Sequence, residues 1–330
     1  MIKNHPRIQN KLRYELGNEV IASLEDPLVT DVVLNEDTKL WAESLGIMKY
    51  IGKMPTERAH NLLRTVASIL GTSITQQSPN VGGEIYLLLK DKYQLLRFQG
   101  VIPPLVSSPI FGIRKPAHRI FSLDEYREQR VITERQQRYL KKAVSNRANI
   151  LIAGGTGTGK TTLINAMLDE IAKQFCNERI AILEDTIELQ CNIANKIQLH
   201  TSDQRSMDDL LYYCLRLRPD RIVIGEVRRS KETQAYIRAL NTGHQGGIAS
   251  VHSNDARCGL LRIEQLIQET GMAAIPEAII QAINVVIFIE RSTKSPVGRQ
   301  VKEILEVKGY NFVTRQYITY SVSEKPEDDE

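Results

Sequence analysis

The fold of this chain is decided by the stretch Gly154-Gly155-Thr156-Gly157-Thr158-Gly159-Lys160-Thr161-Thr162. The apolar run 149–153 before it is typical of a buried strand, and residues 163–168 after it are typical of the start of a helix. Gly154, four intervening residues and then Gly159-Lys160-Thr161 fit the Walker A pattern, whose backbone N–H groups converge on phosphates. A strand, this loop and a helix in that order predict a nucleotide-binding domain.

Each part of the loop has a chemical task on the phosphate side of ATP. The glycines expose backbone N–H groups, and the N-terminus of the following helix adds the positive end of its dipole. Lys160 can reach the β- and γ-phosphates, and the hydroxyl of Thr161 can ligate Mg²⁺. We therefore expect ATP and Mg²⁺ as ligands, with nucleotide contacts from Gly154, Gly155, Thr156, Gly157, Thr158, Gly159, Lys160, Thr161 and Thr162. The alternative is a glycine- and threonine-rich loop that matches the pattern by accident.

Length and composition are ordinary for a globular protein with two domains. The chain has 330 residues, of which 42% are hydrophobic and 25% charged. A net charge of +4 over this length is too small to indicate nucleic-acid binding by itself. It allows a weak attraction to anionic lipid, and no run approaches the length of a membrane-spanning helix, so we expect any membrane association to be peripheral.

The cysteines and the N-terminus favour a cytoplasmic location. The four cysteines are far apart and form no C-x-x-C pair, so they predict neither a zinc site nor a disulfide framework. The first residues lead into a charged helical pattern and lack the apolar core of a signal peptide. Reduced thiols in a cytoplasmic protein are the expectation.

Residues 1–115 predict an N-terminal α+β domain with a small, mostly antiparallel sheet. Apolar residues at helical spacing predict one helix over 7–25, and a second helix is expected at about 55–70. Short alternating runs predict strands, at 29–35, 39–43, 47–51, 85–89, 94–98 and 110–114. A polar, charged segment at 116–132 is expected to be the interdomain linker.

Residues 133–320 alternate between predicted strands and helices, which is typical of a parallel sheet covered by helices. The strands expected at 283–290, 301–307 and 312–320 look antiparallel. The last residues, 321–330, form an acidic tail that we expect to be disordered.

Two strands of the second domain are predicted to end in acids near the γ-phosphate. The strand 221–225 is followed by Glu226, where the usual Walker B motif has Asp, and the strand 180–183 is followed by Glu184 and then Glu188. Acids at the carboxyl ends of parallel strands repel one another unless a cation offsets them, and Mg·ATP supplies that cation. We expect Glu226 to support Mg²⁺ and its water, and Glu184, or as second choice Glu188, to activate the attacking water. Ordinary solvated carboxylates are the alternative.

Two histidines and two arginines complete the set of candidates. His244 and His252 straddle the apolar segment 248–251, and an imidazole can report nucleotide state by hydrogen bonding to a phosphate or a carboxylate. We expect that role for His252, and either nucleotide contact or a structural role for His244. Arg97 and Arg114 stand at strand ends of the first domain, and the residues alone indicate surface arginines.

Four stretches in order resemble the secretion ATPase superfamily of type II and type IV systems: GGTGTGKTT, ILEDTIEL, RPDRIVIGEVR and NTGHQGGIASVHSN. In that superfamily they are called Walker A, Asp box, atypical Walker B and His box. LRFQGVIPP and FGIRKP in the first domain are similar to the part of the family that supplies nucleotide-contacting arginines, so the resemblance covers about residues 10–310. LRLRPDRIVIGEVR and NTGHQGG look like the conjugal-transfer, Trb-type ATPases of type IV secretion.

The resemblance implies a RecA-like ATPase domain preceded by a smaller, PAS-like α+β domain. It implies a homo-hexameric ring that holds nucleotide between the domains, with Arg97 and Arg114 approaching the phosphates. Mg²⁺-dependent ATP hydrolysis would then drive a conjugative or type IV secretion apparatus from the cytoplasm, through partners at the inner membrane. Arg216, Arg218 and Arg228 match arginine positions around the Walker B segment, with roles that the resemblance leaves open.

Three other functions share parts of this pattern. A type IV pilus or type II secretion motor uses the same chemical residues, although such motors more often have Asp-Pro-Asp at 218–220. A DNA-stimulated translocase needs a basic channel with aromatic residues, and the sequence has no concentrated patch of that kind, so we expect no direct sequence-specific nucleic-acid binding. A nucleotide-operated structural switch would bind ATP without turnover.

Overall fold

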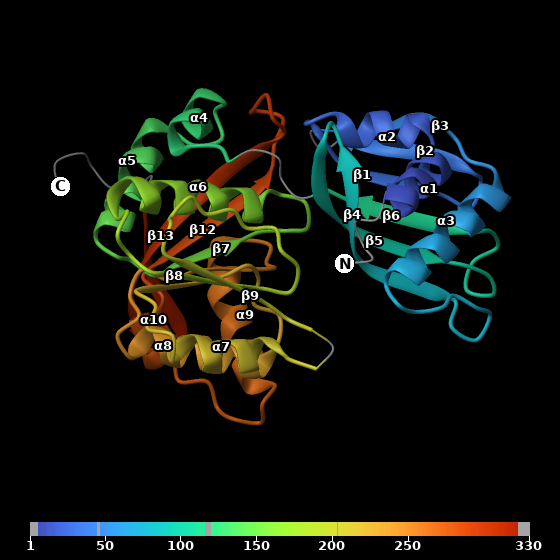
Figure 1. Cartoon of the computed structure of the whole chain (residues 1–330). Helices are drawn as coiled ribbons and strands as arrows, with labels where there is room; N and C mark the ends of the chain where they lie inside the picture. Colours follow the sequence, from blue (N-terminus) through green and yellow to red (C-terminus); the bar gives the residue numbers. More distant parts are fainter. Residues whose placement is uncertain (1–5, 45–46, 116–119, 203, 323–330) are drawn as a thin grey trace. The chain divides into compact units, whose positions relative to one another are not determined.

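The computed structural model describes residues 6–44, 47–115, 120–202 and 204–322, which form two compact units (Figure 1). Unit 1 comprises residues 1–118 and unit 2 comprises residues 119–330. No helix within the described residues is long and apolar enough to cross a membrane. The acidic tail expected over 321–330 lies outside the described residues from position 323 onward.

Unit 1 is a six-stranded antiparallel sheet in the order β3-β2-β1-β6-β5-β4. Its helices are α1 (Pro6–Leu16), α2 (Asn18–Glu25) and α3 (Thr56–Ile69). Its strands are β1 (Val29–Leu34), β2 (Lys39–Ser44), β3 (Ile47–Lys53), β4 (Asn80–Leu89), β5 (Lys92–Val101) and β6 (Ile110–Arg114). Buried side chains such as Leu12, Leu62 and Phe98 join the helices to one face of the sheet.

The single helix expected over 7–25 is two helices in the structure. Gly17 lies between α1 and α2 with φ of +86°, a left-handed conformation that glycine adopts without steric cost. The apolar spacing continues across this break, because Leu16, Val20 and Leu24 are all buried in the same core. The apolar periodicity of the sequence therefore predicted the buried face of both helices but not the break at Gly17.

Unit 2 is an eight-stranded sheet in the order β14-β13-β12-β7-β11-β10-β8-β9. Its strands are β7 (Ile150–Ala153), β8 (Ile180–Glu184), β9 (Lys196–His200), β10 (Arg221–Ile224), β11 (Ile248–Val251), β12 (Val285–Arg291), β13 (Arg299–Asn311) and β14 (Gln316–Ser321). Its helices are α4 (Leu123–Glu128), α5 (Glu134–Ser145), α6 (Lys160–Gln174), α7 (Met207–Leu215), α8 (Ser230–Asn241), α9 (Ala256–Gln268) and α10 (Pro276–Ala282). The predicted α/β class with a parallel sheet is confirmed.

The central strands β7, β8, β10 and β11 are buried at every residue, as the middle of a parallel sheet covered by helices requires. Leu151 of β7 packs in the core with α7, α8 and α9, whereas its neighbour Ile152 packs in the core with α5 and α6. Figure 1 shows α6 on one side of this sheet and α7 and α8 on the other. The six strands from β12 to β9 are parallel, so their carboxyl ends meet at one edge.

Two expectations about this half of the chain need correction. The strand expected at 283–290 pairs antiparallel with β13 but parallel with β7, so β12 belongs to the parallel sheet. Of the linker expected at 116–132, residues 116–119 lie outside the described residues, and the remainder belongs to unit 2. Leu123 and Tyr126 of α4 are buried in the core that also contains α5 and α6. These apolar side chains fix the segment to the unit.

Candidate nucleotide site

The phosphate loop lies between β7 and α6, at the edge where the parallel strands end. A Cβ on Gly154 would lie 2.5 Å from the backbone carbonyl oxygen of Ile289 in β12, so only glycine lets the loop start this close to the neighbouring strand. Gly159 precedes the helix with φ of +100°, which other residues rarely adopt. The strand–loop–helix predicted from the sequence is confirmed.

Lys160 is folded back into this loop. Its Nζ donates to the carbonyl oxygens of Gly154 and Gly155, each at 2.9 Å, and lies 3.3 Å from Nδ1 of His252. Burial lowers the pKa of Lys160, and the negative charge of Glu226 opposes that effect. The hydroxyl of Thr158 donates to the Gly155 carbonyl oxygen at 2.9 Å, and this hydrogen bond stabilises the loop. The ammonium group is thus held inside the loop by contacts that a bound phosphate can replace.

A chain of polar side-chain contacts runs from Lys160 along the ends of β11 and β10. His252 follows β11, and its Nε2 lies 2.7 Å from Oε1 of Glu226, which follows β10. The contact is not aligned for hydrogen bonding, so this buried oxygen has no hydrogen bond in the described structure. Arg228 Nη2 donates to the other oxygen of Glu226 at 2.7 Å, and Nη1 lies 3.2 Å from Asp185. The hydrogen bond to Glu226 raises the pKa of Arg228.

The acid that ends β8, Glu184, and the acid that follows it in the next turn, Glu188, have different surroundings. Glu184 is 3% exposed, and its Oε1 accepts hydrogen bonds from the backbone N–H groups of Glu188 at 2.9 Å and Leu189 at 2.7 Å. It therefore holds the turn after the strand. Glu188 is half-buried, and its Oε2 accepts a hydrogen bond from the hydroxyl of Thr161 at 3.4 Å. The structure thus brings Glu188 to the first turn of α6, whereas Oε1 of Glu184 binds the backbone of the turn after β8.

The oxygens at this edge fit Mg²⁺. Mg²⁺ takes oxygen ligands and, with nucleotides, needs only one or two carboxylates besides the phosphates and water. The Thr161 hydroxyl and the Oε1 atom of Glu226 that lacks a hydrogen bond are ligands of that kind. Among the described residues, no group of three or more His, Cys, Asp or Glu side chains could hold a metal by itself.

His244 lies at the other edge of the sheet. It precedes β11 whereas His252 follows it, and the two ends of one strand lie at opposite edges. Nδ1 of His244 is 3.2 Å from the carbonyl oxygen of Ala239, near the end of α8. The structure therefore does not bring His244 to the phosphate loop, and the nucleotide contact considered for it is corrected to a contact with α8.

Arg97 and Arg114 belong to unit 1 and stand directly opposite each other on β5 and β6. Both are exposed. Arg114 Nε donates to Oδ1 of Asp31 at 2.8 Å, in the strand on its other side. On their other sides, Glu84 stands opposite Arg97 and Asp31 stands opposite Arg114, so each arginine also has an acid on the neighbouring strand.

Two arginines near the loop were missed by the sequence reasoning. Arg291 ends β12 and Arg299 begins β13, and they pair across the hairpin. A Cβ on Gly157 would lie 2.8 Å from Nη2 of Arg291, and a Cβ on Gly159 would lie 2.7 Å from Nη1 of Arg299. They could have been found only by knowing that the strand 285–291 pairs with β7, and the sequence pattern does not show that pairing.

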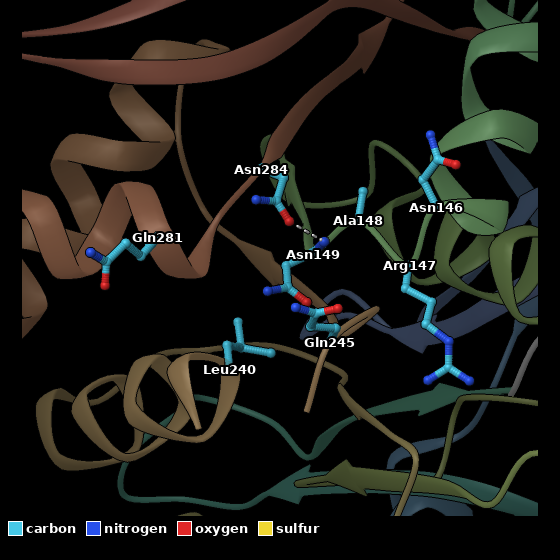
Figure 2. A pocket seen from close by; sticks show the side chains of 8 residues that line it. All are labelled: Asn146, Arg147, Ala148, Asn149, Leu240, Gln245, Gln281 and Asn284. Atoms are coloured by element: carbon cyan, nitrogen blue, oxygen red, sulfur yellow. Dashed lines mark hydrogen bonds between the residues drawn. The ribbon is translucent and has the colours of Figure 1, made fainter. Parts of the chain in front are cut away.

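A pocket of about 310 Å³ lies at the edge opposite the phosphate loop (Figure 2). Its lining includes the amide side chains of Asn149, Gln245 and Asn284, from segments that precede β7, β11 and β12. Oδ1 of Asn284 accepts a hydrogen bond from the backbone N–H of Asn149 at 2.8 Å, drawn as a dashed line in Figure 2. Because it stands where these strands begin, this pocket is separate from the candidate nucleotide site.

Comparisons with known proteins identify the family of this chain. The chain matches the family model "Type II/IV secretion system protein" over residues 55–313. It is 39% identical over 320 residues to the conjugal transfer protein TrbB of Rhizobium radiobacter, which covers 96% of this chain and 96% of the relative.

Solved structures share the fold. The X-ray structure of the Legionella pneumophila ATPase DotB matches with a TM-score of 0.62 at 15% identity, over 92% of this chain and 78% of that chain. The crystal structure of the pilus retraction motor PilT with bound ADP matches with a TM-score of 0.60 at 19% identity, over 92% of this chain and 81% of that chain. The family model covers most of the chain, and the TrbB likeness covers nearly all of it. The chain therefore belongs to the family of type II/IV secretion system proteins.

Proposed function

We propose that the chain is a Mg²⁺-dependent ATPase that drives a conjugative or type IV secretion apparatus. One observation carries the proposal: Lys160, His252 and Glu226 form a continuous chain of contacts at the edge where the strand before the phosphate loop ends. A nucleotide-binding loop needs an acid and a polar side chain at this place to couple the γ-phosphate to hydrolysis. The 39% identity to a conjugal transfer protein over both chains supports the transport role.

The side chains have distinct tasks in this proposal. Lys160 leaves the carbonyl oxygens of Gly154 and Gly155 and binds the β- and γ-phosphates. The side-chain oxygens of Thr161 and Glu226 would hold Mg²⁺. Bound Mg²⁺ would neutralise the charge that develops on the phosphate oxygens. His252 loses its contact with Lys160 when the lysine moves, and so reports nucleotide state to Glu226.

We assign activation of the attacking water to Glu188 in preference to Glu184. Glu184 is buried and accepts two backbone hydrogen bonds, so its Oε1 has a structural task. Glu188 is half-buried and lies beside Thr161, the first residue after the lysine. The sequence alone favoured Glu184 over Glu188, so this assignment reverses that prediction.

Glu188→Gln is expected to lower kcat for ATP hydrolysis by about 100-fold or more with ATP binding retained, because the amide cannot take up the proton of water. Glu184→Gln is the matched control, since its amide oxygen can still accept both backbone hydrogen bonds. We expect its kcat to stay within about threefold of the parent. Steady-state phosphate release at saturating Mg·ATP checks both variants. A severe loss in Glu184→Gln with normal turnover in Glu188→Gln would reverse the assignment.

The assembly and the location belong to the same proposal. We propose a homo-hexameric ring, docked from the cytoplasm onto inner-membrane components of the apparatus and only peripherally associated with the membrane. Arg97 and Arg114 would contact the γ-phosphate in the assembled ring. Both side chains are exposed, which supports contact with a partner.

The pilus and type II motors remain the nearest alternative, because they share the fold. The likeness to the pilus retraction motor PilT is 19% identical, against 39% for the conjugal transfer protein TrbB. Sequence identity thus favours conjugal transfer within one common architecture.

A further inference from the structure

The phosphate loop has a second charged neighbour, on the side away from Glu226. The strand order places β7 between β11 and β12. His252 and Glu226 follow β11 and β10 on one side, whereas Arg291 and Arg299 lie at the β12–β13 hairpin on the other. The loop is therefore flanked by acids and an imidazole on one side and by two guanidinium groups on the other.

The guanidinium groups lie directly against the loop. The ideal Cβ positions at Gly157 and Gly159 are 2.8 Å from Nη2 of Arg291 and 2.7 Å from Nη1 of Arg299. Both glycines have positive φ, +71° and +100°, so the backbone turns here as an anion-binding loop does. The arginine side chains fill the space that side chains at these two positions would take.

The two positive charges stand opposite each other across the hairpin. Arg291 and Arg299 pair opposite each other, and neither forms an ion pair with an acid in the part of the chain that the structure describes. The Nε of Arg299 donates to the carbonyl oxygen of Val297 at 3.4 Å. The neighbouring acid Glu290 is paired with Lys302 at 3.2 Å. Two adjacent arginines without a counter-charge repel each other, and an anion bound between them would relieve that repulsion.

We propose that Arg291 and Arg299 form an anion subsite that holds the diphosphate part shared by ATP and ADP. This rests on the proposed function, which puts the γ-phosphate and Mg²⁺ on the side of Glu226. The arginine side then faces the phosphates that hydrolysis leaves unchanged. Arginine suits this task because its planar, fixed donors match phosphate oxygens. The subsite binds substrate and product equally, so it sets how long ADP stays bound.

The test uses Arg291→Ala and Arg299→Ala in the full chain, with dissociation constants of ADP and ATP measured by titration calorimetry. Each variant is expected to weaken ADP and ATP by the same factor, about tenfold, the size of one charge-assisted hydrogen bond. KM for ATP should rise by a similar factor, with kcat at saturation within about threefold. Arg291→Lys keeps the charge, and its affinity for ADP and ATP should lie between that of Arg291→Ala and that of the parent.

Lys308→Ala is the matched control, because it removes one positive charge from β13 far from the loop, where Lys308 pairs with Glu306 at 2.9 Å. Its nucleotide affinities should equal those of the parent. If Arg299→Ala loses its cooperative thermal transition, Arg299→Gln replaces it. Unchanged ADP affinity in all the arginine variants, or a loss confined to ATP together with a fall in kcat, would overturn the subsite.

The two proposals fail in different ways. ADP binding requires no turnover. A parent chain that binds ADP but never hydrolyses ATP would therefore contradict the proposed function, while the ADP affinities of the arginine variants would still test the subsite. A parent chain that hydrolyses ATP while the arginine variants bind ADP normally removes the subsite alone.

Discussion

Lys160→Ala is expected to reduce ATP hydrolysis by about 100-fold or more, the size of effect seen when a preorganised charge at a transition state is removed. The ammonium group is the positive charge of the loop itself, held by the carbonyl oxygens of Gly154 and Gly155. Nothing in the loop replaces it, because the flanking Arg291 and Arg299 lie on the other side, against Gly157 and Gly159. Phosphate release at saturating Mg·ATP measures the loss.

Lys173→Ala is the control for this prediction. Lys173 lies on the same helix and pairs with Asp169 at 2.7 Å, with 49% of its side chain exposed. Its removal takes away the same charge and should leave hydrolysis within about twofold of the parent, since exposed ion pairs contribute little. A Lys160→Ala chain that hydrolysed ATP as fast as the parent would end the assignment of this loop as the catalytic centre.

Glu178→Ala is expected to lower the free energy of unfolding of unit 2 by about 3–5 kcal/mol, the cost of leaving a buried charge without its partner. Arg221, at the start of β10, is 1% exposed, and its Nε donates to Glu178 Oε2 at 2.5 Å. The other oxygen of Glu178 accepts a hydrogen bond from Arg147. The guanidinium of Arg221 also lies 4.6 Å from the centre of the Phe175 ring. One carboxylate therefore serves two arginines, and its removal leaves both without a counter-charge.

Urea unfolding followed by far-ultraviolet circular dichroism measures this effect. Glu290→Ala is the matched control, because it breaks an ion pair whose partners, Lys302 and Glu290, are 62% and 35% exposed. We expect that control to cost no more than about 1 kcal/mol. Equal shifts of the two unfolding midpoints would contradict the structural role of the buried cluster.

The phosphate loop could be predicted from the sequence because its information is local. The loop needs glycines at fixed spacing, an apolar strand before it and a helix after it, and all of these lie within residues 149–168. The parallel sheet was likewise predicted, since strands and helices alternate along the chain. The acids after β8 and β10 followed from the rule that parallel strands end at one edge.

The side chains that depend on strand order could not be predicted. The strand ending at Arg291 looked antiparallel from its apolar pattern, and only its pairing with β7 brings it beside the loop. The separate tasks of Glu184 and Glu188 depend on the backbone of the turn between them, which the sequence does not encode in a recognisable pattern. Strand direction alone could have placed His244 and His252 at opposite edges, but two histidines around one strand suggested a shared role.

The interdomain segment shows a similar limit. Its charged composition indicated a linker, yet Leu123 and Tyr126 are enough to anchor it in the core of unit 2. The helix there begins with a capping box, in which the Ser122 hydroxyl accepts from the backbone N–H of Glu125 at 3.2 Å. For a short helix, the few apolar positions and the N-terminal cap therefore predict packing into a core better than the average polarity of the segment does.

The central proposal is that this chain hydrolyses ATP as a homo-hexameric ring, and one measurement tests it most directly. Phosphate release by the full chain is recorded beside particle mass, with and without Mg·ATP. We expect Mg²⁺-dependent phosphate release from particles containing six copies of the 37.4-kDa chain. Tight ATP binding without phosphate release from particles of any size would contradict the account and leave a nucleotide-operated structural switch.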